Sequence, residues 1–292
     1  MNMPNYLIDT HCHLHDQEWF TPEQADQFLQ EAHAANVRQI VVIGTDPQDS
    51  TNARDFAQAH PNVFWTYGIH PEYAASPEIS DALLGEELRK LREKIRSYGE
   101  DERVNPATAG VDDALRARVS VVSCPSAPVA IGEIGLDYHY DGYDRTAQIH
   151  LFEQMLQLAQ DLSLPVSLHI REAFDDAWPI LDNFPHLTGV VHSFTGGKKD
   201  LKKALAREFY IGVNGLATYT TPPLPPLEKM LLETDAPFLT PVPFRGTINK
   251  PGYVREIATY LSEKLGVAEV NIAEQTTNNA KQLFQFGDAS LC

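Results

Sequence analysis

Near its beginning the chain reads Tyr6-Leu7-Ile8-Asp9-Thr10-His11-Cys12-His13. The short apolar run Tyr6–Ile8 is typical of a buried strand. Two imidazoles follow it two residues apart, so both side chains project to the same side of an extended segment. A strand that ends in metal-ligating side chains is typical of the active-site face of a (β/α)8 barrel, and such a barrel needs seven further strands.

Seven more apolar or β-branched runs follow. They are Ile40–Ile43, Val63–Tyr67, Val129–Ile131, Pro165–Ile170, Val190–Val191, Phe209–Val213 and Met230–Leu232. Helical patterns accompany them, beginning with a capping box at Thr21-Pro22-Glu23-Gln24 and continuing at Ala53–Ala59, Leu151–Leu162, Tyr253–Leu265 and Ala268–Phe284. We therefore predict the fold class α/β, as a TIM-type (β/α)8 barrel. A doubly wound open sheet is the alternative, and it is disfavoured because no Gly-x-Gly-x-x-Gly follows the first strand.

Two segments depart from the regular alternation of strands and helices. Ser97–Ala127, which precedes the fourth strand, contains several turn-forming residues, and we interpret it as an insertion. The segment between Val213 and Met230 contains four prolines, which forbid a regular helix, so we predict an abbreviated seventh βα unit. We expect residues 1–292 to form one barrel domain.

Composition and charge limit the classes of function. The 292 residues carry a formal net charge of −17, which argues against binding nucleic acid through a broad basic surface. Bound divalent cations can still supply positive charge locally for a phosphorylated substrate. Three cysteines lack zinc-knuckle spacing, and the chain shows neither a secretory signal nor an apolar run of about 18 residues. We expect a reduced, cytoplasmic protein with no membrane span.

Polar side chains recur where the predicted strands end. They are Asp9, His11 and His13 after the first strand, His70 after the third, Glu133 after the fourth, His169 and Arg171 at the end of the fifth, His192 after the sixth and Asp235 after the eighth. Strand ends converge on one face of a barrel, where active sites are built. Taken singly, each residue can be a packed histidine, a solvated acid or a helix cap, but their shared placement favours one site.

These residue types suit divalent cations such as zinc, manganese and iron. His11 and His13 can reach one cation, and Glu133 can bridge two cations through its two oxygens. Two cations would clamp the attacking and the leaving oxygen of a displacement. Asp235 can complete the first cation site, and it is the candidate catalytic residue that orients or deprotonates the attacking water.

His70 and Arg171 are candidate substrate-binding residues. His70 either contacts the substrate or packs against Pro71. Arg171 either holds an anionic group through its planar guanidinium or pairs with Glu172. The basic cluster at Lys198, Lys199, Lys202 and Lys203 is interpreted as a solvated helix face rather than as a patch that steers a polyanion.

Six motifs in order carry a resemblance to a known family. They are Ile8–Leu14, Gly68–Pro71, Ile131–Tyr138, Pro165–Arg171, Val191–Gly196 and Leu232–Pro237. Together they resemble the TatD-like family of metal-dependent deoxyribonucleases, within the amidohydrolase-type barrels. The chain departs from the family pattern twice: the region Ser97–Ala127 is longer, and the segment between Thr220 and Met230 is shorter and lacks the usual helix.

The resemblance implies a TIM barrel with two divalent cations, which would be Mg²⁺, Mn²⁺ or Zn²⁺. It implies that one cation is held by His11, His13, Glu133 and Asp235, and the other by Glu133, His169 and His192. Asp235 would also activate the water. Family members are described as 3′-to-5′ exonucleases on DNA, and some are linked to RNA or to removal of D-amino acids from tRNA. Nucleic acid ends are thus the expected partner, and we predict no protein partner.

Three functions compete at this stage. A metal-dependent phosphodiesterase is favoured, because Glu133 occupies the position where amidohydrolase barrels often carry a metal-bridging lysine. An amidase, lactonase or aminoacyl-ester hydrolase on the same site is the alternative. A non-catalytic binding protein on a decayed barrel is the third hypothesis; the abbreviated seventh unit motivates it, and the complete set of ligand positions argues against it.

Overall fold

The computed structural model describes residues 6–76, 85–86, 88–93 and 127–285. Its centre is a sheet of eight parallel strands in which each strand pairs with the next one along the chain. The strands are β1 (Leu7–Cys12), β2 (Val37–Ile43), β3 (Val63–Tyr67), β4 (Ala130–Asp137), β5 (Val166–Arg171), β6 (Gly189–Val191), β7 (Tyr210–Val213) and β8 (Met230–Leu232). The predicted insertion Ser97–Ala127 lies outside the described residues, except for Ala127 itself.

Hydrogen bonds between the carboxyl end of β1 and the segment that follows β8 close the sheet into a barrel. The amide of His13 donates to the carbonyl of Ala236 (2.7 Å), and the amide of Asp235 donates to the carbonyl of His11 (2.8 Å). A doubly wound open sheet has no such contact between its first and last strands. The predicted barrel is therefore confirmed.

Asp9 adds a side-chain link between the same two segments. Its carboxylate accepts hydrogen bonds from the amide (2.8 Å) and the hydroxyl (2.6 Å) of Thr234. Both residues are fully or almost fully buried. Because buried donors need partners, this pair fixes the position of the segment that carries Asp235.

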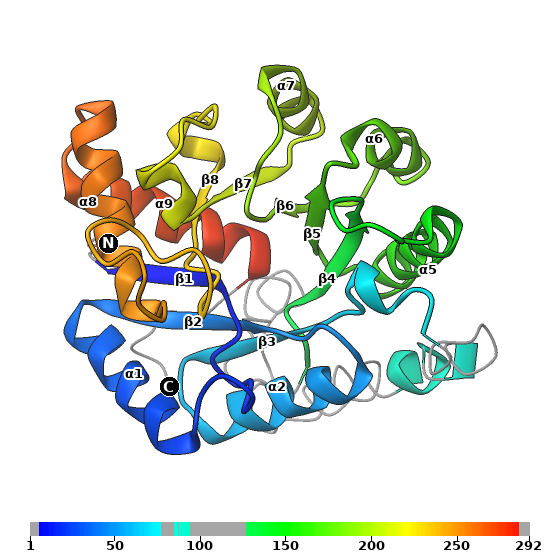
Figure 1. Ribbon diagram of the computed structural model, residues 1–292, viewed down its shortest axis with the longest axis horizontal. Coiled ribbons are helices and arrows are strands. Elements are labelled where there is room, and N and C mark those ends of the chain that lie inside the picture. The colour runs from blue at the N-terminus through cyan, green and yellow to red at the C-terminus, as the bar shows by residue number, and fades with distance from the viewer. Residues whose placement is uncertain (1–5, 77–84, 87, 94–126, 286–292) are drawn as a thin grey trace, which may run out of the picture.

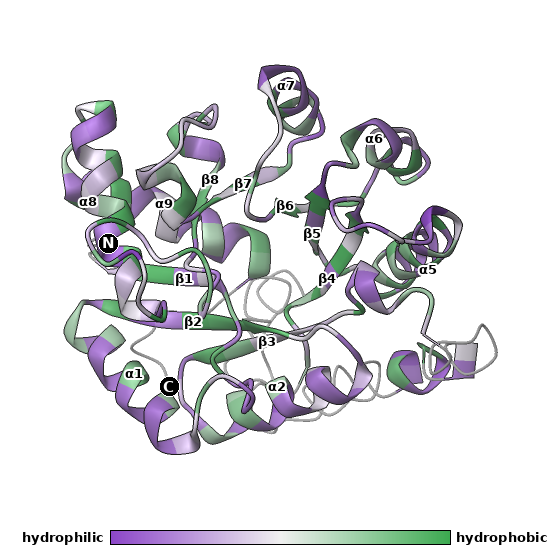
Figure 2. Cartoon of the chain, in the orientation of Figure 1, coloured by the Kyte–Doolittle hydropathy of each residue, from purple (hydrophilic) through white to green (hydrophobic). Residues whose placement is uncertain are grey.

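The helices lie around the outside of the sheet (Figure 1). They are α1 (Pro22–Ala34), α2 (Pro47–Ala59), α5 (Arg145–Leu162), α6 (Phe174–Asp182), α7 (Lys198–Ala206), α8 (Val254–Leu265) and α9 (Glu269–Phe284), with short 3-10 turns at η1 (Pro71–Tyr73) and η7 (Pro251–Tyr253). Residues 85–86 and 88–93 are also helical. Figure 2 shows mostly hydrophobic strands inside helices of mixed character, as expected where each helix packs one apolar stripe on the sheet. None of the described helices combines the length and the apolarity that a membrane span needs.

Two strands run further than the sequence predicts. β1 continues to Cys12 and β4 to Asp137, so His11 and Glu133 lie within strands rather than after them. The apolar pattern stops at the first polar side chain, but the backbone pairing does not, since β4 still pairs with β5 at Asp137 and Arg171. The backbone of these candidate ligands is therefore held by the sheet.

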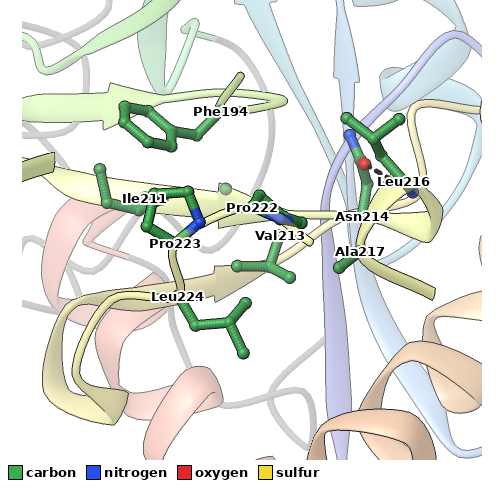
Figure 3. A pocket seen from close by; sticks show the side chains of 10 residues that line it. Phe194, Ile211, Val213, Asn214, Leu216, Ala217, Pro222, Pro223 and Leu224 are labelled. Atoms are coloured by element: carbon green, nitrogen blue, oxygen red, sulfur yellow. Dashed lines mark hydrogen bonds between the residues drawn. The ribbon is translucent and has the colours of Figure 1, made fainter. Parts of the chain in front are cut away.

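The chain between β7 and β8 forms no α-helix over residues 214–229, which confirms the predicted abbreviation. It contains two 3-10 turns instead, η5 (Gly215–Thr218) and η6 (Leu227–Lys229). Figure 3 shows the proline-rich segment beside β7, where Pro222, Pro223 and Leu224 line a cavity of only about 10 Å³. The prolines thus pack closely over the strand in place of a helix.

Candidate metal centre

The structure brings the six predicted ligands together at the carboxyl ends of the strands. His11 lies in β1 and His13 just after it, Glu133 lies in β4, His169 in β5, His192 directly after β6, and Asp235 three residues after β8. His169 and Asp235 are half-buried, and the other four are buried. The six side chains therefore form one largely buried cluster.

One half of the cluster surrounds Oε2 of Glu133. Nε2 of His11 lies 3.5 Å from this oxygen and 3.5 Å from Oδ1 of Asp235. Nε2 of His13 lies 3.8 Å and 3.7 Å from the same two oxygens. Ligand atoms about 2.1 Å from one tetrahedral ion lie about 3.4 Å apart. The spacing of His11, His13 and Glu133 therefore suits ligands of one shared cation, and Oδ1 of Asp235 lies beside the two histidines.

The other half surrounds Oε1 of Glu133. Nδ1 of His169 lies 2.7 Å from this oxygen, and Nε2 of His192 lies 3.0 Å from it. The rings of His11 and His192 stack with their centroids 3.7 Å apart, so the two halves adjoin. Each oxygen of Glu133 thus faces a different pair of histidines.

Unpaired polar atoms in the cluster indicate that it fits a cation. Neither ring nitrogen of His11 has a hydrogen-bond partner among the described residues, although both are buried. A buried polar atom without a partner costs free energy, and a cation on Nε2 would remove part of that cost. The ligand atoms of His11, His13 and Glu133 lie close enough to share one ion, as do those of Glu133, His169 and His192.

The electrostatics of the cluster favour positive charge. Burial alone raises the pKa of Glu133, but His192 and His11 outweigh it and hold that pKa well below its usual value. Burial also raises the pKa of Asp235. The contacts with His13, His192 and His11 lower it by more, so this pKa too lies below its usual value. Both carboxylates are therefore ionised at neutral pH. The residues present fit one or more divalent cations.

Comparison with known proteins places the chain in a family. The family model described as "TatD related DNase" matches residues 8–285. The chain belongs to the TatD-related DNase family. Together with the barrel and the histidine–carboxylate cluster, this membership makes it a metal-dependent hydrolase of the TatD type.

Relatives of this chain match it along nearly their whole length. The "uncharacterized metal-dependent hydrolase YabD" of Bacillus subtilis (strain 168) is 31% identical over 288 residues, covering 96% of this chain and 99% of the relative. The "3'-5' ssDNA/RNA exonuclease TatD" of Citrobacter rodentium (strain ICC168) is 31% identical over 277 residues, covering 89% and 91%. The crystal structure of YjjV, a TatD homologue from Escherichia coli K12, aligns with a TM-score of 0.76 at 29% identity, covering 98% of this chain and 100% of that one.

Two further acidic side chains contact the histidines of the cluster. Oδ2 of Asp137 is 3.2 Å from Nε2 of His169, and Oε1 of Glu233 is 3.5 Å from Nδ1 of His192. The sequence offered a weak signal for both, since Asp137 is within the Ile131–Tyr138 motif and Glu233 has the same parity as Asp235. The shared parity indicates that Glu233 and Asp235 can support each other, whereas the sequence assigns Asp137 no role, because side-chain contacts between strands cannot be inferred from spacing along one strand.

The two candidate substrate-binding residues lie on the same face. His70 packs edge-on against His169 at 4.5 Å, and burial, followed by the charge of that histidine, lowers its pKa to about 3. The guanidinium of Arg171 lies 5.3 Å from the ring of Tyr140, and no ion pair of Arg171 occurs among the described residues. Glu172, its expected alternative partner, instead pairs with His139 at 2.6 Å. Arg171 donates instead to the hydroxyl of Tyr140 at 3.4 Å and has no carboxylate partner among the described residues.

Proposed function

We propose that this protein is a two-cation phosphodiesterase that hydrolyses nucleic acid from the 3′ end. The observation that carries the proposal is Glu133, whose two oxygens face two separate pairs of histidines. His11, His13 and Asp235 would hold one cation with Oε2, and His169 and His192 the other with Oε1. Two divalent cations supply, when bound, positive charge for both the attacking and the leaving oxygen of a phosphoryl displacement.

Asp235 is the proposed catalytic base. Its side chain is half-buried, so it meets both the cluster and the substrate side of the barrel. Its lowered pKa keeps it ionised at neutral pH, and an ionised carboxylate can accept the proton of the attacking water. Nε2 of His13 lies 3.7 Å from Oδ1 of this carboxylate, and burial, which lowers the pKa of His13, is outweighed by the negative charges of Asp235 and Glu133.

Substrate binding is assigned to Arg171 and His70. Arg171 offers a guanidinium without a carboxylate partner among the described residues, and such a group suits a phosphate. His70 is kept neutral by its low pKa, so it can accept or donate one hydrogen bond without adding charge. The similarity to the Citrobacter rodentium relative, which is named a single-stranded DNA and RNA exonuclease, supports this substrate class.

The test is a screen of cations against substrates. Protein freed of metal by a chelator is reloaded with Mg²⁺, Mn²⁺ or Zn²⁺ and incubated with single-stranded DNA, RNA, amides and aminoacyl esters. We expect nucleotide release with at least one cation, and its loss in Asp235→Asn but not in Asp175→Asn, an exposed aspartate of α6. Hydrolysis of amides or esters alone would favour the alternative hydrolase. A protein that neither binds a cation nor hydrolyses any substrate would contradict both.

A further inference from the structure

Two exposed aromatic side chains stand next to the metal centre. Trp19 is 47% exposed and Phe238 is 46% exposed, although each carries a large apolar surface. Their rings meet edge to face with centroids 5.3 Å apart. The ring of Phe238 also lies 6.5 Å from the ring of His13. The pair therefore forms an exposed apolar surface next to His13, a proposed cation ligand.

Both aromatic residues are held in position by turns that start from proposed ligands. The amide of Phe238 donates to the carbonyl of Asp235 (2.8 Å), and the buried side chain of Asn249 donates to the carbonyl of Phe238 (2.6 Å). The amide of Asp16 donates to the carbonyl of His13 (3.0 Å), and that of Trp19 to the carbonyl of Asp16 (3.2 Å). These hydrogen bonds fix the backbone of the two turns that carry Trp19 and Phe238.

An exposed, fixed aromatic pair beside a phosphodiesterase centre suits an unpaired base. Each base has a flat π face that stacks on aromatic side chains, whatever its sequence. A base inside a duplex has both faces covered by its neighbours, so only a single-stranded end can use such a surface. A phosphate held at the metal centre leaves its attached base within reach of a neighbouring aromatic ring.

We propose that Trp19 and Phe238 form a stacking platform for an unpaired base next to the scissile phosphodiester. This rests on the proposed function, because it assigns the substrate of the same centre. The platform gives this acidic protein a source of affinity that does not depend on surface charge. It also selects single-stranded ends over blunt duplex ends.

The test compares oligonucleotides with and without the base that would stack. Two single-stranded DNAs differ only in whether the terminal nucleotide carries a base or is abasic, and phosphorothioate linkages slow their hydrolysis. Affinity is measured for the Mg²⁺-loaded protein. We expect the intact end to bind about 5- to 150-fold more tightly, which corresponds to about 1–3 kcal/mol per base. Trp19→Ala and Phe238→Ala should lose most of this preference, and Trp19→Phe should retain it.

Tryptophan fluorescence gives a second readout. Of the three tryptophans, Trp65 and Trp178 are buried, so quenching by the intact oligonucleotide reports on Trp19. We expect the quenching to vanish in Trp19→Phe while binding persists. Phe244→Ala is the matched control, because Phe244 lies in the same loop but stacks on Tyr253 at 4.5 Å.

The outcomes separate the platform from the proposed function. Cleavage of DNA with no preference for the intact end, unchanged in Trp19→Ala, overturns the platform alone. Preference and quenching without any nucleotide release support the platform and overturn the phosphodiesterase. A protein that binds neither oligonucleotide overturns both.

Discussion

Nε2 of His169 lies 3.2 Å from Oδ2 of Asp137, while Nδ1 of the same ring lies 2.7 Å from Oε1 of Glu133. Asp137 is itself held by Gln148, which accepts from its amide and donates to its carbonyl at 2.9 Å each. If Nδ1 held a cation, Nε2 would carry the proton of the imidazole and would donate it to Asp137. Carboxylates in this position orient metal-binding histidines and raise their basicity.

The first prediction concerns this contact. Asp137→Ala should weaken one of the two cation sites by about 10- to 100-fold and leave the other unchanged, because His169 is the one proposed ligand that loses a contact; the amide of His139, which also donates to Asp137, belongs to neither site. Asp137→Asn, whose side-chain oxygen still accepts the Nε2 proton, should recover part of the loss. Titration of the chelator-treated protein with Mn²⁺ measures both affinities. Two wild-type affinities in Asp137→Ala would show that the contact has no role in metal binding.

The second prediction concerns the closure of the barrel. Asp9→Ala removes the acceptor of both the amide and the hydroxyl of Thr234, and these donors are buried. We expect the free energy of unfolding to fall by about 1–3 kcal/mol or more, measured by urea denaturation in the presence of a chelator. Thr234→Ser, which keeps the hydroxyl, is the control and should lose less. Equal stability of Asp9→Ala and wild type would contradict a structural role for Asp9.

The third prediction concerns the abbreviated seventh unit. The buried side chain of Asn279 on α9 donates to the carbonyls of Leu227 and Met230, each at 2.8 Å. Asn279→Ala should therefore cost about 1–3 kcal/mol of unfolding free energy, because two carbonyls lose their donor. Asn278→Ala, the neighbouring residue on the same helix, should have a smaller effect. Thermal denaturation of both variants distinguishes a specific loss from a general effect on α9.

Much of the fold could be predicted from the sequence, because each strand is an apolar run with polar residues at its end. The ends of β1 and β4 could not, because polar His11 and Glu133 interrupt the apolar pattern while the backbone remains paired. Four prolines predicted the missing helix before β8. The prolines did not predict the hydrogen bond from Asn279 to the carbonyl of Leu227, because the two residues are 52 positions apart in the chain.

The candidate site, too, could be predicted only in part from the sequence. The positions of six polar residues at strand ends predicted that they would meet, since parallel strands end on one face. The orientation of Glu133, with one oxygen toward each histidine pair, depends on side-chain geometry that spacing does not encode. The contact between Trp19 and Phe238 joins residues 219 positions apart and could not be predicted from either motif (238 − 19).

Glu133 is proposed to join two cation sites, and this role decides the chemistry of the whole cluster. It is tested most directly by counting the Mn²⁺ ions bound per chain, with their affinities, in wild type, Glu133→Gln and the control Glu153→Gln on the exposed face of α5. We predict two ions per chain in wild type and in the control. Binding should be weaker at both sites in Glu133→Gln, because the shared ligand loses its negative charge and one of its two oxygens. A single ion in wild type, or two ions that Glu133→Gln binds as tightly as wild type, would contradict the account.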